Sequence, residues 1–148
     1  DPRAIDYGII ATDAKLPMAQ RLVEIHEAVT ELIQIFRPDA VAVERLFFAQ
    51  NVTTAMTVGQ ARCVVLLAAA QRGLPVAEYA PSEVKQAVVG GGAADKAQVQ
   101  HMVGVLLNIP GRLQADAADA LAIALTHAHT RSSVERLGIP RTAWRRRR

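Results

Sequence analysis

The stretch AVAVE, residues 40–44, is a short apolar run that ends in a single acid. Four small or β-branched apolar residues in succession predict a buried strand of the kind found in parallel sheets. Before it, residues 18–36 carry apolar side chains at intervals of three and four positions, which predicts an amphipathic helix. Pro38 ends that helix. A helix that leads into a buried strand indicates an α/β fold.

The segments on either side extend this pattern. A strand is predicted in RAIDYGIIAT, residues 3–12, which contains β-branched and aromatic residues. A long apolar helix is predicted at 53–72 and is stopped by Gly73. The remaining predicted elements are a strand at 74–80, a short helix from about 81 to the glycine cluster at 90–92, a helix at 94–107 and a last helix that begins at 114. This order of elements predicts an α/β domain in which helices cover a mixed sheet.

Length and composition fit one domain with a substantial core. The chain has 148 residues, of which 51% are apolar, so wholesale disorder is not expected. No apolar run is long enough to cross a bilayer, and no basic segment followed by an apolar one marks export. The single cysteine, Cys63, cannot form a disulfide or a thiolate metal site within one chain. We therefore expect a cytoplasmic protein without a membrane partner.

The net charge of +3 is unevenly distributed along the chain. From Arg131 onward there are seven arginines and one glutamate, Glu135, so this end is strongly basic and the remainder is slightly acidic. Nucleic acid is one partner that fits such an end, and a solvated terminus without a partner is the other explanation.

Three acids are predicted at a strand end or a helix start, positions from which side chains in an α/β fold can line a crevice. Glu44 ends the buried strand, and ligands of open α/β sheets bind beyond the carboxyl ends of strands. Asp116 and Asp119 lie three residues apart at the start of the last helix and share one of its faces. Each acid also has a purely structural explanation. Glu44 can simply mark the end of the strand, and the two aspartates can be a helix cap followed by a first-turn acid that suits the helix dipole. If the three pack together, their repulsion calls for a hard divalent cation, Mg²⁺ above all.

Other residues allow weaker interpretations. The glycine cluster at 90–92, between Lys85 and Lys96, lacks the Walker A spacing, and an ordinary helix connection is favoured over a phosphate site. Phe47 follows the strand end and either stacks on nucleic-acid bases or anchors a loop. For His127, a surface or partly buried position on the last helix is favoured over metal ligation.

Four stretches together resemble the bacterial RuvC-type Holliday junction resolvases. They are PDAVAVERLFFAQN, VGQAR, YAPSEVKQAVVGGGAADKAQVQHMV and ADAADALAIALTHAH, in this order and spacing, and the resemblance covers about residues 4–130. It implies a ribonuclease H-like fold, a homodimer and symmetric Mg²⁺-dependent cutting of four-way DNA junctions in recombination and repair. It also implies a branch-migration motor complex as a partner.

The resemblance implies specific roles for individual residues. Glu44 matches the family's catalytic strand-end glutamate, and Asp116 and Asp119 match its helix-start aspartates. These acids would bind two Mg²⁺ ions per site, with Mn²⁺ as an alternative. One ion would activate water and the other would stabilise the leaving 3′-oxygen. The residues that match positions near the DNA are Lys85, Lys96 and Phe47.

The chain departs from the family's pattern at its start. Family members begin with a strand that carries an Asp-Pro-Gly motif and with a second strand, whereas this sequence opens DPR. We therefore expect a nuclease domain at residues 1–130 that lacks this N-terminal hairpin, a basic tail at 131–148, and a sequence that is part of a longer chain. Asp1 is either a remnant of the motif or a coincidence. Smaller departures are Gln50, where a basic residue is common, and Cys63, where glycine is usual.

Two functions of other kinds stay open at this point. A junction-binding protein without catalysis would fit the missing first strand and its acid, and would bind junctions independently of metal. Another ribonuclease H-like nuclease would cut RNA–DNA hybrids or transposon ends as readily as junctions.

Overall fold

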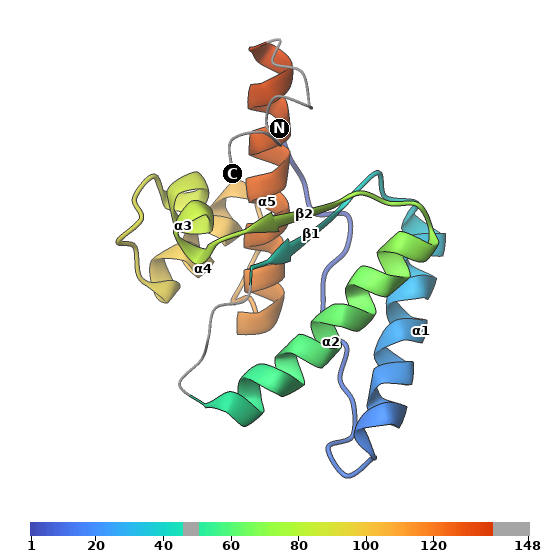
Figure 1. Ribbon diagram of the computed structural model, residues 1–148. Coiled ribbons are helices and arrows are strands. Elements are labelled where there is room, and N and C mark those ends of the chain that lie inside the picture. The colour runs from blue at the N-terminus through green and yellow to red at the C-terminus, as the bar shows by residue number, and fades with distance from the viewer. Residues whose placement is uncertain (46–50, 138–148) are drawn as a thin grey trace. The chain divides into compact units, whose positions relative to one another are not determined.

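The computed structural model describes residues 1–45 and 51–137, which hold seven helices and strands (Figure 1). They are α1 (Met18–Phe36), β1 (Val41–Glu44), α2 (Val52–Gln71), β2 (Val76–Tyr79), α3 (Pro81–Val89), α4 (Lys96–Leu106) and α5 (Ala115–Arg136). The chain divides into two compact units. We call Ile9–Glu78 the sheet unit, and Asp1–Gly8 together with the chain from Tyr79 onward the three-helix unit.

The sheet unit contains a two-stranded parallel sheet within the described part of the chain. β1 and β2 are neighbours and run in the same direction (Figure 1), and the Val41 N–H donates to the Pro75 carbonyl oxygen over 2.9 Å. α2 connects the two strands, which completes a β–α–β motif, and α1 packs against α2. The predicted α/β class is therefore confirmed.

Local residues explain where α1 and α2 begin and end. Arg37 adopts a left-handed conformation, with φ of 46°, and its N–H donates to the carbonyl oxygen of Ile33. Pro38 then prevents the helix from continuing, so α1 ends where the sequence predicts. α2 begins after Asn51, whose side chain accepts a hydrogen bond of 3.2 Å from the Thr54 N–H.

The three-helix unit is built from α3, α4 and α5, which pack against one another. Pro81 starts α3, and Gly90 ends it with φ of 84°, a conformation that favours glycine. α4 starts with a reciprocal cap, in which Asp95 accepts from the Gln98 N–H and the Gln98 side chain accepts from the Asp95 N–H. The buried apolar side chains on the three helices are Val84, Val88, Val99, Val103, Ala117, Ala118, Leu121, Ala122 and Leu125.

The prediction of a strand at residues 3–12 is wrong. These residues form no strand, and Ile5 and Ile9 are 78% and 56% exposed. A β-branched composition favours extended backbone, but a strand also needs ladder hydrogen bonds from a neighbouring strand. The described strands β1 and β2 pair with each other and not with this segment.

Two further predictions, one about a domain boundary and one about membrane-spanning helices, can be compared with the helices of the structure. The boundary predicted at residue 130, between a nuclease domain and a tail, lies inside α5, which continues to Arg136. Residues 138–148 of the tail lie outside the described residues, so this division stays a prediction. α2 is the one described helix long and apolar enough to cross a bilayer by length and composition, although inspection of the sequence predicted none. Its most apolar stretch is 11% buried in the structure, and one such helix is weak evidence for a membrane span.

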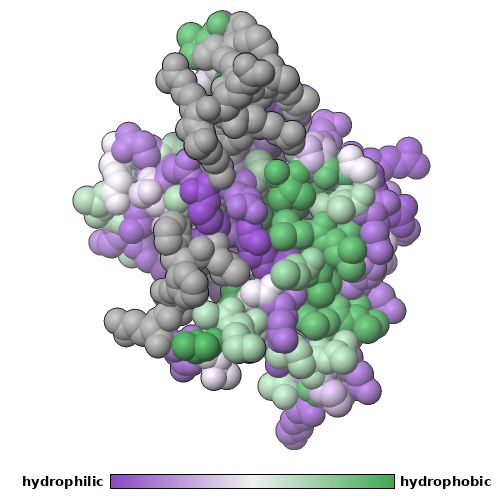
Figure 2. Space-filling view, viewed as in Figure 1, coloured by the Kyte–Doolittle hydropathy of each residue, from purple (hydrophilic) through white to green (hydrophobic). Residues whose placement is uncertain are grey.

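Apolar side chains are exposed on both helices of the sheet unit. Figure 2 shows apolar residues gathered over the part of the surface that holds these helices. The exposed large apolar residues of α1 and α2 are Val23, Leu32, Ile35, Phe36, Val52, Met56, Val58 and Leu67.

Candidate active site

Glu44 lies where the sequence predicts it, as the last residue of β1. The three strand residues before it are partly buried, and Glu44 itself is exposed. The carboxyl end of a parallel strand is where side chains leave the core of an α/β fold. Glu44 is therefore an accessible acid on an ordered element.

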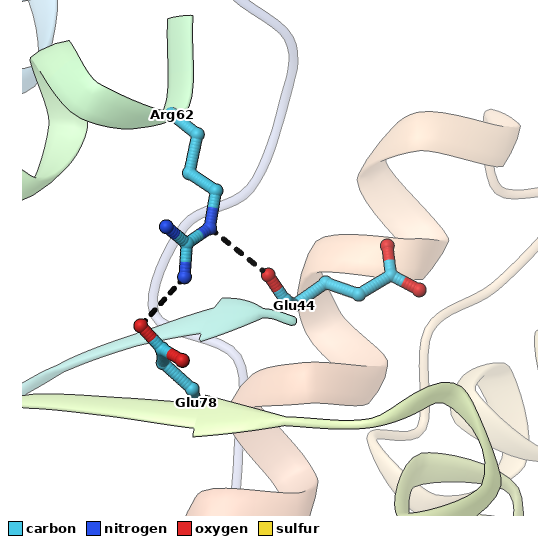
Figure 3. Close-up of polar contacts among 3 residues, drawn as sticks. All are labelled: Glu44, Arg62 and Glu78. Atoms are coloured by element: carbon cyan, nitrogen blue, oxygen red, sulfur yellow. Dashed lines mark hydrogen bonds and ion pairs between the residues drawn. The ribbon is translucent and has the colours of Figure 1, made fainter. Parts of the chain in front are cut away.

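Arg62 links the ends of the two strands (Figure 3). Its Nη2 lies 2.6 Å from Oε1 of Glu78, and its Nε donates to the backbone carbonyl oxygen of Glu44 over 3.3 Å. The carboxylate of Glu44 is directed away from the guanidinium, as Figure 3 shows. The sequence analysis missed this arrangement. The sequence feature that could have revealed it is an arginine inside an apolar helix and a glutamate inside an apolar strand.

Asp116 and Asp119 lie on the first two turns of α5. The helix is capped by Gln114, whose side-chain oxygen accepts a hydrogen bond of 3.2 Å from the Ala117 N–H. Asp116 is exposed in the first turn, where an acid suits the helix dipole, and Asp119 is partly exposed one turn later. Neither aspartate is the helix cap, so that part of the alternative explanation is wrong, whereas Asp116 is the first-turn acid that it expects.

Lys96 and Asp119 form an ion pair across α4 and α5. The Lys96 Nζ lies 3.0 Å from Oδ2 of Asp119, and the two side chains are 64% and 42% exposed. Lys96 is the first residue of α4. The structure therefore brings together a predicted DNA-binding residue and a predicted metal ligand, which the sequence analysis had placed in separate groups.

The other two predicted DNA-binding residues are Lys85 and Phe47. Lys85 is half-buried on α3. Phe47 lies outside the described residues. Their assigned roles stay predictions.

The acids do not form a complete metal site within either unit. In the described part of each unit, no three His, Cys, Asp or Glu side chains gather closely enough to hold a metal ion. Asp116 and Asp119 belong to the three-helix unit and Glu44 to the sheet unit. The two aspartates supply only carboxylate oxygens, which hard divalent cations prefer. The ammonium of Lys96 at Asp119 shows that a cation is accommodated there.

Tyr79 and His127 form a partly buried contact that the sequence analysis also missed. The Tyr79 hydroxyl and Nδ1 of His127 are 2.8 Å apart, and the two rings meet edge to face. Burial raises the pKa of Tyr79 above its usual value of 10.0, and the Glu83 carboxylate adds to this, whereas a hydrogen bond with Thr130 lowers it. This contact favours a packing role for His127 over metal ligation.

The sequence and fold match one known family. The family model described as crossover junction endodeoxyribonuclease RuvC matches residues 2–127. The chain belongs to the RuvC family. RuvC from Xanthomonas euvesicatoria pv. vesicatoria is 52% identical over 129 residues, which are 86% of this chain and 74% of that relative. RuvC from Chloroflexus aurantiacus is 51% identical over 138 residues, which are 93% of this chain and 84% of that relative.

Solved RuvC structures agree with this membership. A structure of Thermus thermophilus RuvC matches with a TM-score of 0.79 and 41% identity, and covers 92% of this chain and 80% of its own. T. thermophilus RuvC in complex with Holliday junction substrate matches with a TM-score of 0.83 and 41% identity, over 88% of this chain and 81% of its own. The resemblance drawn from four stretches is thus confirmed, and the chain is an endodeoxyribonuclease by family. All six predicted site residues lie inside the RuvC match.

Proposed function

We propose that this protein resolves four-way DNA junctions by symmetric, divalent-metal-dependent hydrolysis of phosphodiester bonds. The observation that carries the proposal is the match to RuvC bound to a Holliday junction, over 88% of this chain. In the reaction, water adds to phosphorus and the bond to the 3′-oxygen breaks, which leaves a 5′-phosphate and a 3′-hydroxyl. The finer assignment of the fold as ribonuclease H-like, with a mixed sheet, belongs to the same proposal.

Glu44, Asp116 and Asp119 are the catalytic carboxylates in this proposal. Each is accessible on a regular element, at a strand end or in the first two turns of α5. Their oxygens would hold Mg²⁺, two ions per site, with Mn²⁺ as an alternative. Bound divalent ions supply Lewis-acid activation of water and stabilisation of the leaving oxygen. The protein's part is to orient these acids at the end of β1 and on the first two turns of α5.

Lys85, Lys96 and Phe47 are the proposed contacts to DNA. Ammonium groups neutralise phosphates and release counterions, and an aromatic ring can stack on a base that has lost its partner. The ion pair of Lys96 with Asp119 supports its place beside the catalytic acids. Because one ammonium serves both groups, a phosphate that engages Lys96 competes with Asp119 for it.

A second copy of this chain is the proposed protein partner. Two sites related by a two-fold axis fit a pseudo-symmetric junction. The exposed apolar residues Val52, Met56 and Leu67 of α2 support a contact there, since monomers rarely expose large apolar patches. Met56→Lys should then shift the protein from dimer to monomer in analytical ultracentrifugation. A branch-migration motor complex and a cytoplasmic location complete the proposal by family analogy.

The first experiment is a cleavage assay on a synthetic four-way junction and a matched linear duplex. We expect paired symmetric nicks in the junction with Mg²⁺ and none with EDTA. Glu44→Gln and Asp119→Asn should abolish the nicks and retain binding in EDTA. Glu24→Gln, which changes an exposed acid on α1, is the matched control and should cut normally. A complex that never cuts would indicate a binding protein, and equal cutting of an RNA–DNA hybrid would indicate another nuclease.

A further inference from the structure

We propose that Arg62 is a positioning residue for Glu44 that acts through the backbone of Glu44 and not through its carboxylate. This inference rests on the proposed function, because it takes Glu44 to be a catalytic acid. It concerns three residues of the sheet unit, Glu44, Arg62 and Glu78, and therefore depends only on contacts inside that unit.

The guanidinium of Arg62 is placed to hold two groups at once. The side chain is 19% exposed, so its donors have lost most of their water and need acceptors from the protein. One acceptor is the Glu78 carboxylate at 2.6 Å, on β2, and the other is the Glu44 carbonyl oxygen at 3.3 Å, at the end of β1 (Figure 3). A planar guanidinium offers several donors in fixed directions to these two neighbouring strands, whereas a lysine ammonium is a compact charge on a flexible stem.

The hydrogen bond from Arg62 to the Glu44 carbonyl oxygen can fix the direction of the Glu44 side chain without pairing Arg62 with the Glu44 carboxylate. A hydrogen bond at the Glu44 carbonyl restrains the peptide plane that follows, and thus the rotation at Glu44 from which the side chain departs. The Glu44 carboxylate itself points away from Arg62 in Figure 3, so the arginine does not neutralise it. The positive charge of Arg62 is instead balanced by Glu78. Within these three residues, the ion pair of Arg62 is therefore with Glu78, and Glu44 is held through its backbone.

A direct ion pair would have had the opposite effect. If Arg62 bound the carboxylate of Glu44, a divalent cation would have to displace a guanidinium before it could bind. With Glu78 as its ion-pair partner, Arg62 orients Glu44 through the backbone carbonyl alone. Partners that orient metal ligands in this way typically change metal affinity or activity by about 10- to 100-fold when they are removed.

The deciding variant is the double substitution Arg62→Met with Glu78→Gln, made in the full-length protein. It removes one positive and one negative charge, so the local net charge stays the same. The main remaining difference from the unaltered protein is then the loss of the hydrogen bond to the Glu44 carbonyl oxygen. Binding of Mn²⁺ is measured by electron paramagnetic resonance of the free ion, without DNA. We expect the half-saturation concentration to rise about 10- to 100-fold, with junction affinity in EDTA and the melting profile close to those of the unaltered protein.

Two further variants keep the test decisive. Arg72→Met alters an exposed arginine at the end of the same helix and should leave Mn²⁺ binding unchanged. Arg62→Lys retains the charge beside Glu78 but lacks the planar guanidinium, and it should weaken Mn²⁺ binding in the same direction even if the double variant fails to fold. The inference is wrong if a folded Arg62 variant binds Mn²⁺ as Arg72→Met does.

Glu44→Gln separates this inference from the function on which it rests. If Glu44→Gln binds Mn²⁺ and cuts junctions normally, the assignment of Glu44 is wrong and the role of Arg62 falls with it. If Glu44→Gln loses both properties while the Arg62 variants keep Mn²⁺ affinity, the catalytic role of Glu44 stands and the inference alone is overturned.

Discussion

The substitution Tyr79→Phe tests the packing of the three-helix unit, which carries two of the proposed catalytic acids. Tyr79 is 3% exposed, and phenylalanine keeps its ring contacts while removing the hydroxyl that lies 2.8 Å from Nδ1 of His127. One buried hydrogen bond contributes about 1 kcal/mol to the free energy of unfolding. For a chain of this size, that loss should lower the melting temperature by about 3 °C near neutral pH.

The size of this effect should depend on pH in a defined direction. Burial raises the pKa of Tyr79 in the folded state above the unfolded value of 10.0. Stability from Tyr79 is therefore fully present below pH 10 and is lost as the pH rises through the folded-state pKa, because the unfolded chain releases the proton first. Tyr79→Phe has no such proton, so the difference in stability between the two proteins should shrink from pH 9 to pH 11.

Urea unfolding followed by circular dichroism at several pH values measures this difference. Tyr7→Phe is the control, since Tyr7 is 48% exposed, and its substitution should leave the free energy of unfolding unchanged. A Tyr79→Phe destabilisation that stays constant or grows above pH 10 would refute the burial of the Tyr79 hydroxyl.

Three further substitutions test other parts of the same unit. Leu125→Ala leaves a cavity under a side chain that is 2% exposed, and calorimetry should show a loss of about 2 to 5 kcal/mol. Gly90→Ala meets no atom within 4 Å but forces alanine to φ of 84°, so chemical denaturation should show a loss of about 1 kcal/mol. Lys96→Met breaks an exposed ion pair with Asp119, so the free energy of unfolding should change by less than about 1 kcal/mol. In junction-binding titrations, the same variant should reduce the dependence of log affinity on log salt by about 1.

The helices were predictable from the sequence because their signals are local. α1 was predicted to the residue, since apolar periodicity and Pro38 are both contained in the segment itself. The strand predicted at residues 3–12 failed for the opposite reason. Its composition is visible locally, but its pairing depends on another part of the chain.

The same distinction applies to the candidate site. The positions of Glu44, Asp116 and Asp119 were predictable because a strand end and a three-residue helical spacing can be read directly from the sequence. The bond from Arg62 to the Glu44 carbonyl joins residues 18 positions apart, and the contact of Tyr79 with His127 joins residues 48 positions apart. Contacts between residues this far apart depend on tertiary packing, which composition and periodicity do not specify. The pairing of Lys96 with Asp119, 23 positions apart, was missed for that reason too.

The position of Lys96 at the start of α4 has a consequence for engineering. A lysine there places positive charge at the positive end of the helix dipole, where an acid would be more stable. A redesign guided by thermal stability alone would replace Lys96 with glutamate and gain a few tenths of a kcal/mol. The same change would put a negative charge beside Asp119. Under the proposed contact of Lys96 with DNA, it would also repel the phosphate backbone, so residue 96 should be left unchanged when the protein is stabilised.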